Sequence, residues 1–254
     1  MEISESIQIE IYPLPIQSNI SPQNNIQQYY FQTPEINIST FTPSGNDSIY
    51  INKSIDPFIN AMTGKEECKN TDDKICVKSS VDSEEYLVLN DIHAQKAADH
   101  LGTLNQLNQT LINLLHEGLK KNKYNDIDTE RVKRLIANYK PNKLFEHKGT
   151  GPEDSSFTIN KGEEISMCMR DPQSRSVQDL GIISFVNLHE VAHVAAEGYG
   201  HEDEFWEAFQ FLLKQAYEHD LYTPVDYSKY PETYCGMVVD YNPYFSNNSK
   251  GFKE

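Results

Sequence analysis

The segment His189-Glu190-Val191-Ala192-His193 carries the residue types of a metal-dependent hydrolase at the spacing of one helical turn. Residues four apart lie on one face of an α-helix, so His189 and His193 can direct both imidazoles at one ion. Glu190 then lies beside a zinc-bound water, where its carboxylate can act as the general base. Zn²⁺ suits such nitrogen ligands, and a catalytic zinc keeps one position open for water. The segment therefore predicts a catalytic zinc site.

A catalytic zinc takes a third protein ligand, and the residues after this helix offer one. Gly198 suits a left-handed residue that ends the helix, and Gly200 allows the chain to fold back tightly. This return brings His201 towards the two helical imidazoles, so we expect His201 to complete the metal site. The alternatives are carboxylates, of which Glu218 is the main one, followed by Glu197 and Asp203.

The two histidines also allow a metal-free interpretation, in which they are core residues packed beside alanine and valine. A lone histidine on an apolar helix face usually has that role. Here a glutamate stands in register between them and a glycine-mediated return leads to a further histidine, which favours the metal. A second His-Glu pair, His116-Glu117, has Lys120 where the second histidine is needed, so it predicts no site.

Apolar periodicity predicts the helices that position these residues. One helix covers residues 183–198, and a second covers 202–220 and packs on the first through its apolar side chains. Upstream, leucines from Leu101 to Leu119 recur on one helix face, with polar residues such as Asn108 turned to water. A shorter helix is expected from residue 128 or 129 to just before Pro141.

Two segments have the pattern of strands. Residues 86–89 are continuously apolar or aromatic, and residues 165–169 alternate between apolar and other side chains. We expect residues 165–169 to form an edge strand, which could align a peptide by strand addition. Together with the helices, these strands predict an α+β fold with a small sheet.

Composition separates residues 1–80 from the rest of the chain. Six of the 12 prolines lie among Asn-, Gln- and Ser-rich stretches in the first 57 residues, which favours a low-complexity extension or a small β appendage. We expect the catalytic domain to cover residues 81–254.

Charge and cysteine content narrow the classes of function. The formal net charge of -16 argues against broad attraction to nucleic acid. Neither a membrane span nor a basic, apolar secretory leader is apparent, so we expect a soluble intracellular protein. In that setting Cys68, Cys76, Cys168 and Cys235 are expected to be free thiols, and the alternative is a Cys68–Cys76 disulfide that clips a loop in an oxidising setting.

The stretch HEVAHVAAEGYGHEDEFW, residues 189–206, resembles the zincin metallopeptidases, most closely the Wss1-like (WLM) and SprT-like proteases. The wider stretch from Tyr86 to Pro243 is similar to WLM-type proteins of large DNA viruses. The resemblance implies a zincin-like catalytic domain in the host cytoplasm or virion. It also implies a possible link to protein substrates bound to DNA, because cellular relatives cleave proteins crosslinked to DNA.

These observations predict a zinc-dependent endopeptidase that hydrolyses protein substrates. Tyr199 is a candidate donor to the oxyanion, although an aromatic side chain buried at a turn is the commoner role. The alternative is a virion or scaffold protein with a zincin fold, whose zinc is structural or whose peptidase is latent. A nucleic-acid adaptor ranks last, because Lys and Arg do not cluster with stacking aromatics.

Overall fold

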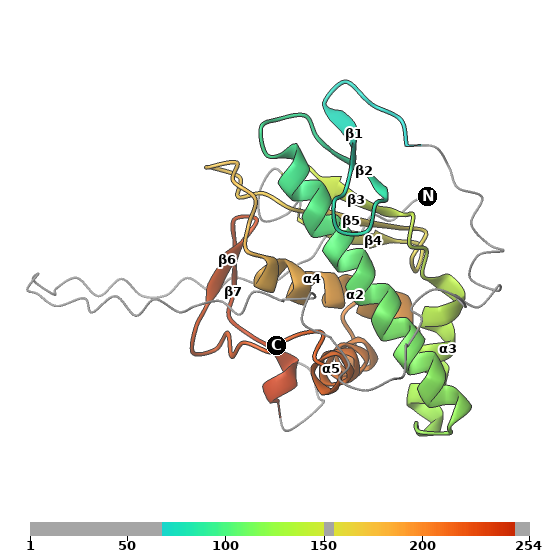
Figure 1. Cartoon of the computed structure of the whole chain (residues 1–254). Coiled ribbons are helices and arrows are strands. Elements are labelled where there is room, and N and C mark those ends of the chain that lie inside the picture. The colour runs from blue at the N-terminus through green and yellow to red at the C-terminus, as the bar shows by residue number, and fades with distance from the viewer. Residues whose placement is uncertain (1–67, 150–154, 247–254) are drawn as a thin grey trace, which may run out of the picture. The chain divides into compact units, whose positions relative to one another are not determined.

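Four α-helices and seven short strands make up residues 68–149 and 155–246, the part of the chain that this computed structural model describes (Figure 1). The mixed α+β class agrees with the prediction. All of these residues belong to one compact unit. Most of the predicted extension, residues 1–67, lies outside the described residues.

The helices lie close to where periodicity places them, within a few residues at each end. Asn125 and Asp179 begin two of them, each accepting a hydrogen bond from a backbone N–H of the first turn. A 3₁₀ turn, η2, follows at Pro243–Phe245. The helices are α2 (Ala94–Lys120), α3 (Asp126–Asn138), α4 (Leu180–Ala195) and α5 (Asp203–Glu218).

A three-stranded sheet has the order β3-β5-β4, so the segment predicted to be an edge strand is in fact central. β5 pairs parallel with β3 on one side and antiparallel with β4 on the other. Alternation along a strand shows which face is buried but cannot show how many neighbours pair with it, and this is why the prediction was wrong. The strands are β3 (Leu144–His147), β4 (Phe157–Ile159) and β5 (Glu164–Cys168).

Two hairpins complete the strands. β1 (Lys74–Lys78) pairs antiparallel with β2 (Glu85–Leu89), so a stretch within residues 1–80 joins the folded part. β2 lies beside β3, where the Leu89 N–H donates to the Glu146 carboxylate at 2.7 Å. β6 (Glu232–Tyr234) pairs with β7 (Met237–Val239).

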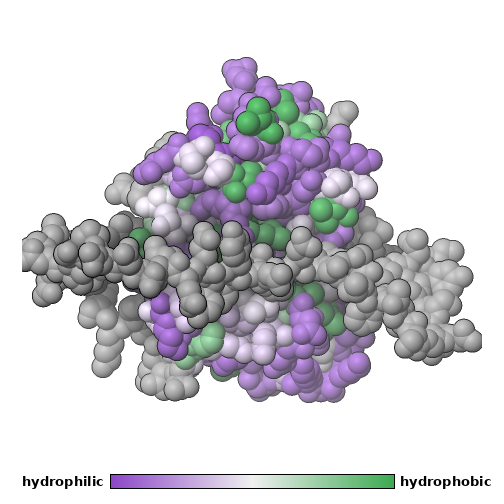
Figure 2. All heavy atoms as spheres, turned by 60° about the vertical axis from the view of Figure 1, so that its left-hand side comes forward, coloured by the Kyte–Doolittle hydropathy of each residue, from purple (hydrophilic) through white to green (hydrophobic). Residues whose placement is uncertain are grey.

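Helix α4 is buried almost all round, as expected of a helix that is apolar on every side. It contacts the other three helices as well as β4 and β6, so its position is set by packing from several directions (Figure 1). Most of the coloured residues visible in Figure 2 are hydrophilic, and the apolar ones among them form small separate groups. No helix within the described residues combines the length and apolar character that a membrane span requires.

One polar residue predicted to face water is buried instead. Asn108 of α2 is fully buried and exchanges two hydrogen bonds with Asn187 of α4, at 2.7 and 3.0 Å. Its amide also donates to the Tyr139 hydroxyl at 3.1 Å. A buried amide needs such partners, and here they tie α2 to α4 two residues before His189.

The prediction of four free thiols is wrong, because the four cysteines form two disulfides, one of them the Cys68–Cys76 alternative. Cys68 pairs with Cys76 across a short loop, with Cα atoms 5.9 Å apart. Cys168 at the end of β5 pairs with Cys235 in the β6–β7 turn, 67 positions later, with Cα atoms 6.3 Å apart. The fold brings this second pair together, and local spacing gives no sign of it.

We expect the Cys168–Cys235 disulfide to contribute more to stability than Cys68–Cys76, because it closes the longer loop. Chain entropy assigns about 4 kcal/mol to the longer loop and about 3 kcal/mol to the shorter one. Chemical unfolding under oxidising conditions should therefore show a larger loss of unfolding free energy for Cys235→Ser than for Cys76→Ser. Equal losses of unfolding free energy in the two variants would contradict this account. So would a variant that stays less stable than wild type by the same amount after the wild-type disulfides are reduced.

Candidate metal centre

Three imidazoles converge beside the carboxyl end of α4. His189 and His193 come from α4, and His201 comes from the return loop, residues 196–202, that joins α4 to α5. Their ligand nitrogens all lie within 4.8 Å of one another, and Nε2 of His189 lies 3.1 Å from Nε2 of His201. In the described part of the chain no other trio of His, Cys, Asp or Glu side chains comes as close.

The carboxylates considered as alternative ligands lie outside this group. Glu218 is at the last turn of α5, where its carboxylate accepts from Gln215 Nε2 at 2.9 Å and pairs with Lys123 at 3.5 Å. Glu197 and Asp203 are also absent from the cluster. The structure therefore places His201, and no candidate carboxylate, beside the two helical histidines.

The return loop does not use the left-handed glycine that was predicted. α4 ends at Ala195 with an extended residue, Ala196, and Gly198 does not have a positive φ. A Cβ on Gly198 or Gly200 would lie 2.9 or 3.0 Å from a carboxylate oxygen of Glu202, an exposed and flexible side chain that can move aside. The chain therefore leaves α4 through an extended residue and without a left-handed glycine.

Phe205 packs against all three imidazoles. Its ring centroid lies 4.3 Å from that of His193, 4.7 Å from that of His201 and 4.8 Å from that of His189. The stacking on His193 is nearly parallel, at 29°. Because Phe205 is itself 1% exposed, it restricts how the histidine rings can rotate.

Burial keeps the three imidazoles neutral at physiological pH. It lowers the pKa of His193 to about 3, with a smaller effect from His201 and Lys161. Burial likewise lowers the pKa of His201 and places that of His189 well below its usual range. A neutral imidazole has a free lone pair, which is the form that binds metals.

Glu190 lies fully buried next to these imidazoles. Thr158 of β4 donates to its Oε2 at 2.9 Å and to its backbone oxygen at 3.1 Å. Its other carboxylate oxygen, Oε1, is buried with no hydrogen-bond partner among the described residues. Burial raises the pKa of Glu190 to about 8, although the Thr158 hydrogen bond opposes the shift.

Of two tyrosines near the site, Tyr199 differs from the prediction and Tyr234 was not predicted. Tyr199, predicted to be buried or to donate to an oxyanion, is 67% exposed, and Lys161 Nζ lies 4.8 Å from its ring centre. Tyr234 of β6 is buried, its hydroxyl 2.5 Å from Ser156 Oγ. Burial, and secondarily the nearby Glu190 carboxylate, raise the pKa of Tyr234. No local pattern in the sequence singles out Thr158 or Tyr234, which come from other elements.

Comparison with known proteins finds relatives among large DNA viruses. The chain is 33% identical over 168 residues to uncharacterized protein R325 of Acanthamoeba polyphaga mimivirus, covering 65% of this chain and 81% of that protein. It is 35% identical over 94 residues to protein 042R of Invertebrate iridescent virus 3, and 37% identical over 87 residues to protein 136R of Invertebrate iridescent virus 6. These matches cover 37% and 34% of this chain, and 57% and 46% of the iridescent-virus proteins. No family model and no solved structure matches the chain.

Proposed function

The chain belongs to the family of this mimivirus protein. We propose that the chain is a zinc-dependent endopeptidase. One observation carries the proposal. Three neutral imidazoles converge within 4.8 Å, and the glutamate next to the first of them is buried with a carboxylate oxygen that has no hydrogen-bond partner. Buried polar atoms normally have a partner, so Oε1 of Glu190 indicates a polar group that binds there.

The residues present fit Zn²⁺. Three nitrogen ligands match a catalytic zinc, which leaves a coordination position open, whereas a structural zinc takes four protein ligands. Within the described residues the group holds three, which favours the catalytic reading over a scaffold with a structural zinc. When bound, zinc acts as a Lewis acid that polarises a carbonyl and acidifies water.

The chain's own groups then carry the proton transfers. Glu190 accepts a proton from the attacking water and can return it to the leaving amine of the cleaved peptide bond. Thr158 holds Oε2 of Glu190, which leaves Oε1 free for this exchange. Phe205 restricts rotation of the histidine rings, so the metal ligands need little reorganisation.

Strand β4 is the best candidate for the peptide-binding element, replacing residues 165–169. In the described part of the chain it is the outer strand of its sheet on the side that contacts α4. An outer strand presents unpaired N–H and C=O groups to which a peptide can add as a further strand. Because Thr158 lies on this strand and holds Glu190, β4 links the proposed peptide site to the base.

We expect Thr158→Val to lower peptidase turnover by about 10-fold, because valine keeps the shape but removes the donor to Glu190. Steady-state kinetics on an unfolded protein substrate would measure it. Thr158→Ser should restore most of the rate, and Thr110→Val on the exposed surface of α2 should change nothing. Turnover of Thr158→Val equal to wild type would show that the hydroxyl does not orient the base.

The resemblance to WLM and SprT-like proteases extends the proposal to proteins bound to DNA as substrates. The net charge of -16 makes direct attraction to DNA weak, so the protein component would provide recognition. Cleavage of an unfolded protein should be measured with and without single-stranded DNA, before and after metal chelation and zinc restoration. Activity that survives complete removal of metal would overturn the zinc mechanism. Zinc-loaded protein that cleaves no substrate would favour the scaffold or latent alternative.

A further inference from the structure

The return loop must hold His201 steadily for it to act as a ligand. Loops are intrinsically less restrained than helices, and this one does not use a left-handed glycine to set its path. Metal ligands depend on outer residues that fix their orientation. The question is therefore which side chains hold residues 196–202 in place.

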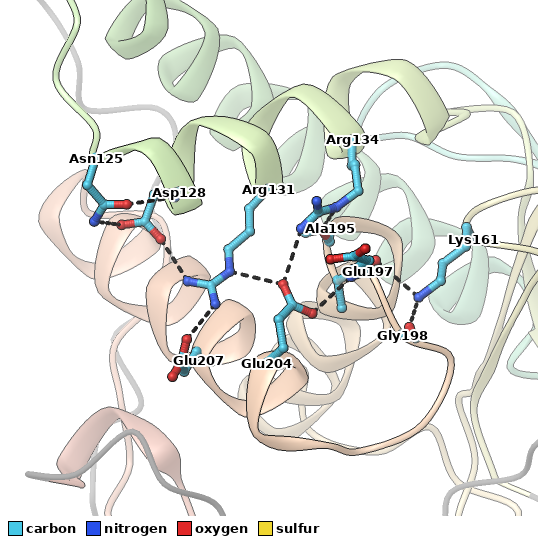
Figure 3. A network of polar contacts seen from close by, with 11 residues as sticks. Asn125, Asp128, Arg131, Arg134, Lys161, Ala195, Glu197, Gly198, Glu204 and Glu207 are labelled. Carbon is cyan, nitrogen blue, oxygen red and sulfur yellow. Dashed lines mark hydrogen bonds and ion pairs between the residues drawn. The ribbon is translucent and has the colours of Figure 1, made fainter.

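One set of contacts comes from α3 and α5 (Figure 3). Arg134 Nε donates to the carbonyl oxygen of Ala195, the last residue of α4, at 2.7 Å. Oε2 of Glu204 accepts from the Glu197 N–H at 2.9 Å. Arg134 Nη2 also donates to Glu204 Oε1 at 3.1 Å. The two residues of this ion pair therefore bind the last residue of α4 and the second residue after it.

Arg131 fixes the position of Glu204 in turn. Its guanidinium, 5% exposed, donates to Glu204 at 3.2 Å, to Asp128 at 2.9 Å and to Glu207 at 2.7 Å. All three donor nitrogens of Arg131 are therefore used, as Figure 3 shows. Such a charge network inside a half-buried interface is more rigid than an exposed ion pair.

Lys161 holds the loop from the opposite side, from the turn between β4 and β5. Its ammonium donates to the carbonyl oxygen of Ala196 at 3.1 Å and to that of Gly198, and lies against the Tyr199 ring. Lys161 and Arg134 both bring positive charge to the carboxyl end of α4, where carbonyls lack helical partners and the helix dipole is negative.

We propose that Arg134, Glu204 and Lys161 form a clamp that positions His201 as the third metal ligand. This inference rests on the proposed zinc site, and it identifies residues that position one of the ligands of that site. Its members bind backbone atoms at Ala195, Ala196, Glu197 and Gly198, which lie between the helical ligands and His201. None of the three belongs to the metal cluster, and they bind the end of α4 and the return loop, so they act on His201 through the backbone. Lys161 also acts on His193 through its charge, an effect that Lys161→Arg preserves.

The test is the zinc affinity of Glu204→Gln and Lys161→Met in the full chain, measured by competition with a chromophoric chelator. Each variant should bind zinc about 10- to 100-fold more weakly than wild type, the usual cost of losing an outer partner. Matched controls come from the exposed Glu130–Lys133 pair of α3, 2.7 Å apart. Glu130→Gln and Lys133→Met should bind zinc as wild type does, and Lys161→Arg should recover most of the affinity.

Cobalt(II) provides a second readout that general destabilisation would not change. Its visible absorption reports ligand number and geometry, so a displaced His201 should shift the spectra of clamp variants towards that of His201→Ala. Circular dichroism should confirm that the variants fold. Affinities and cobalt spectra equal to wild type would overturn the clamp alone. Wild type that binds no zinc would overturn the proposed function and the clamp together.

Discussion

Glu190→Gln should reduce peptidase turnover by about 10² to 10⁴-fold while leaving zinc content and thermal stability at wild-type values. The amide keeps the size of the carboxylate, and its oxygen can still accept from Thr158, but it cannot accept a proton from the attacking water. Glu190 does not belong to the metal cluster, so its replacement should not release the ion. Kinetics on an unfolded protein, metal analysis and thermal unfolding would measure the three quantities.

The second His-Glu pair supplies the matched control. Glu117 lies exposed on α2, paired with Lys120 at 2.8 Å, so Glu117→Gln makes the same replacement of a carboxyl by an amide outside the metal cluster. This variant should retain full turnover. If Glu190→Gln were as active as wild type, Glu190 would not be the base. If wild type and Glu190→Gln were both inactive on every substrate while carrying zinc, the result would favour the alternative of a scaffold protein.

Replacement of any one of the three histidines should abolish stoichiometric zinc binding. We expect His189→Ala, His193→Ala and His201→Ala each to weaken zinc affinity by more than about 100-fold, beyond the largest usual effect of an outer partner. Each loses one of three nitrogen ligands that converge within 4.8 Å. Metal analysis after dialysis against a weak chelator should find about one zinc per wild-type chain and much less in the variants.

Two controls separate this site from its alternatives. His116→Ala tests the pair that lacks a second histidine, and Glu218→Gln tests the carboxylate that sequence reasoning kept as an alternative ligand. Both should keep one zinc, because neither residue lies in the cluster. Loss of zinc from Glu218→Gln together with its retention in His201→Ala would reverse the assignment of the third ligand.

The cysteines and Asn108 show where local pattern misleads. Free thiols were expected, and a solvated Asn108 was expected from its polarity. Instead Cys168 pairs with Cys235, and Asn108 forms hydrogen bonds with Asn187 inside the core. In both cases the partner is more than 60 positions away. Residue type predicts that a buried amide needs a partner, but only the fold supplies that partner.

The sequence by itself determined the register of His189, Glu190 and His193. The apolar residues of α4 predict a buried helix, and a helix repeats every 3.6 residues, which places the two histidines on one face. It also determined the extents of the helices to within a few residues. The tertiary structure decided which residue joins the two histidines, which strand is outermost, and that Thr158 holds the base. These outcomes depend on how separate elements pack and on charged contacts between them, such as those of Arg134 with the end of α4 and of Lys161 with the return loop. Periodicity within one element carries no information about such contacts.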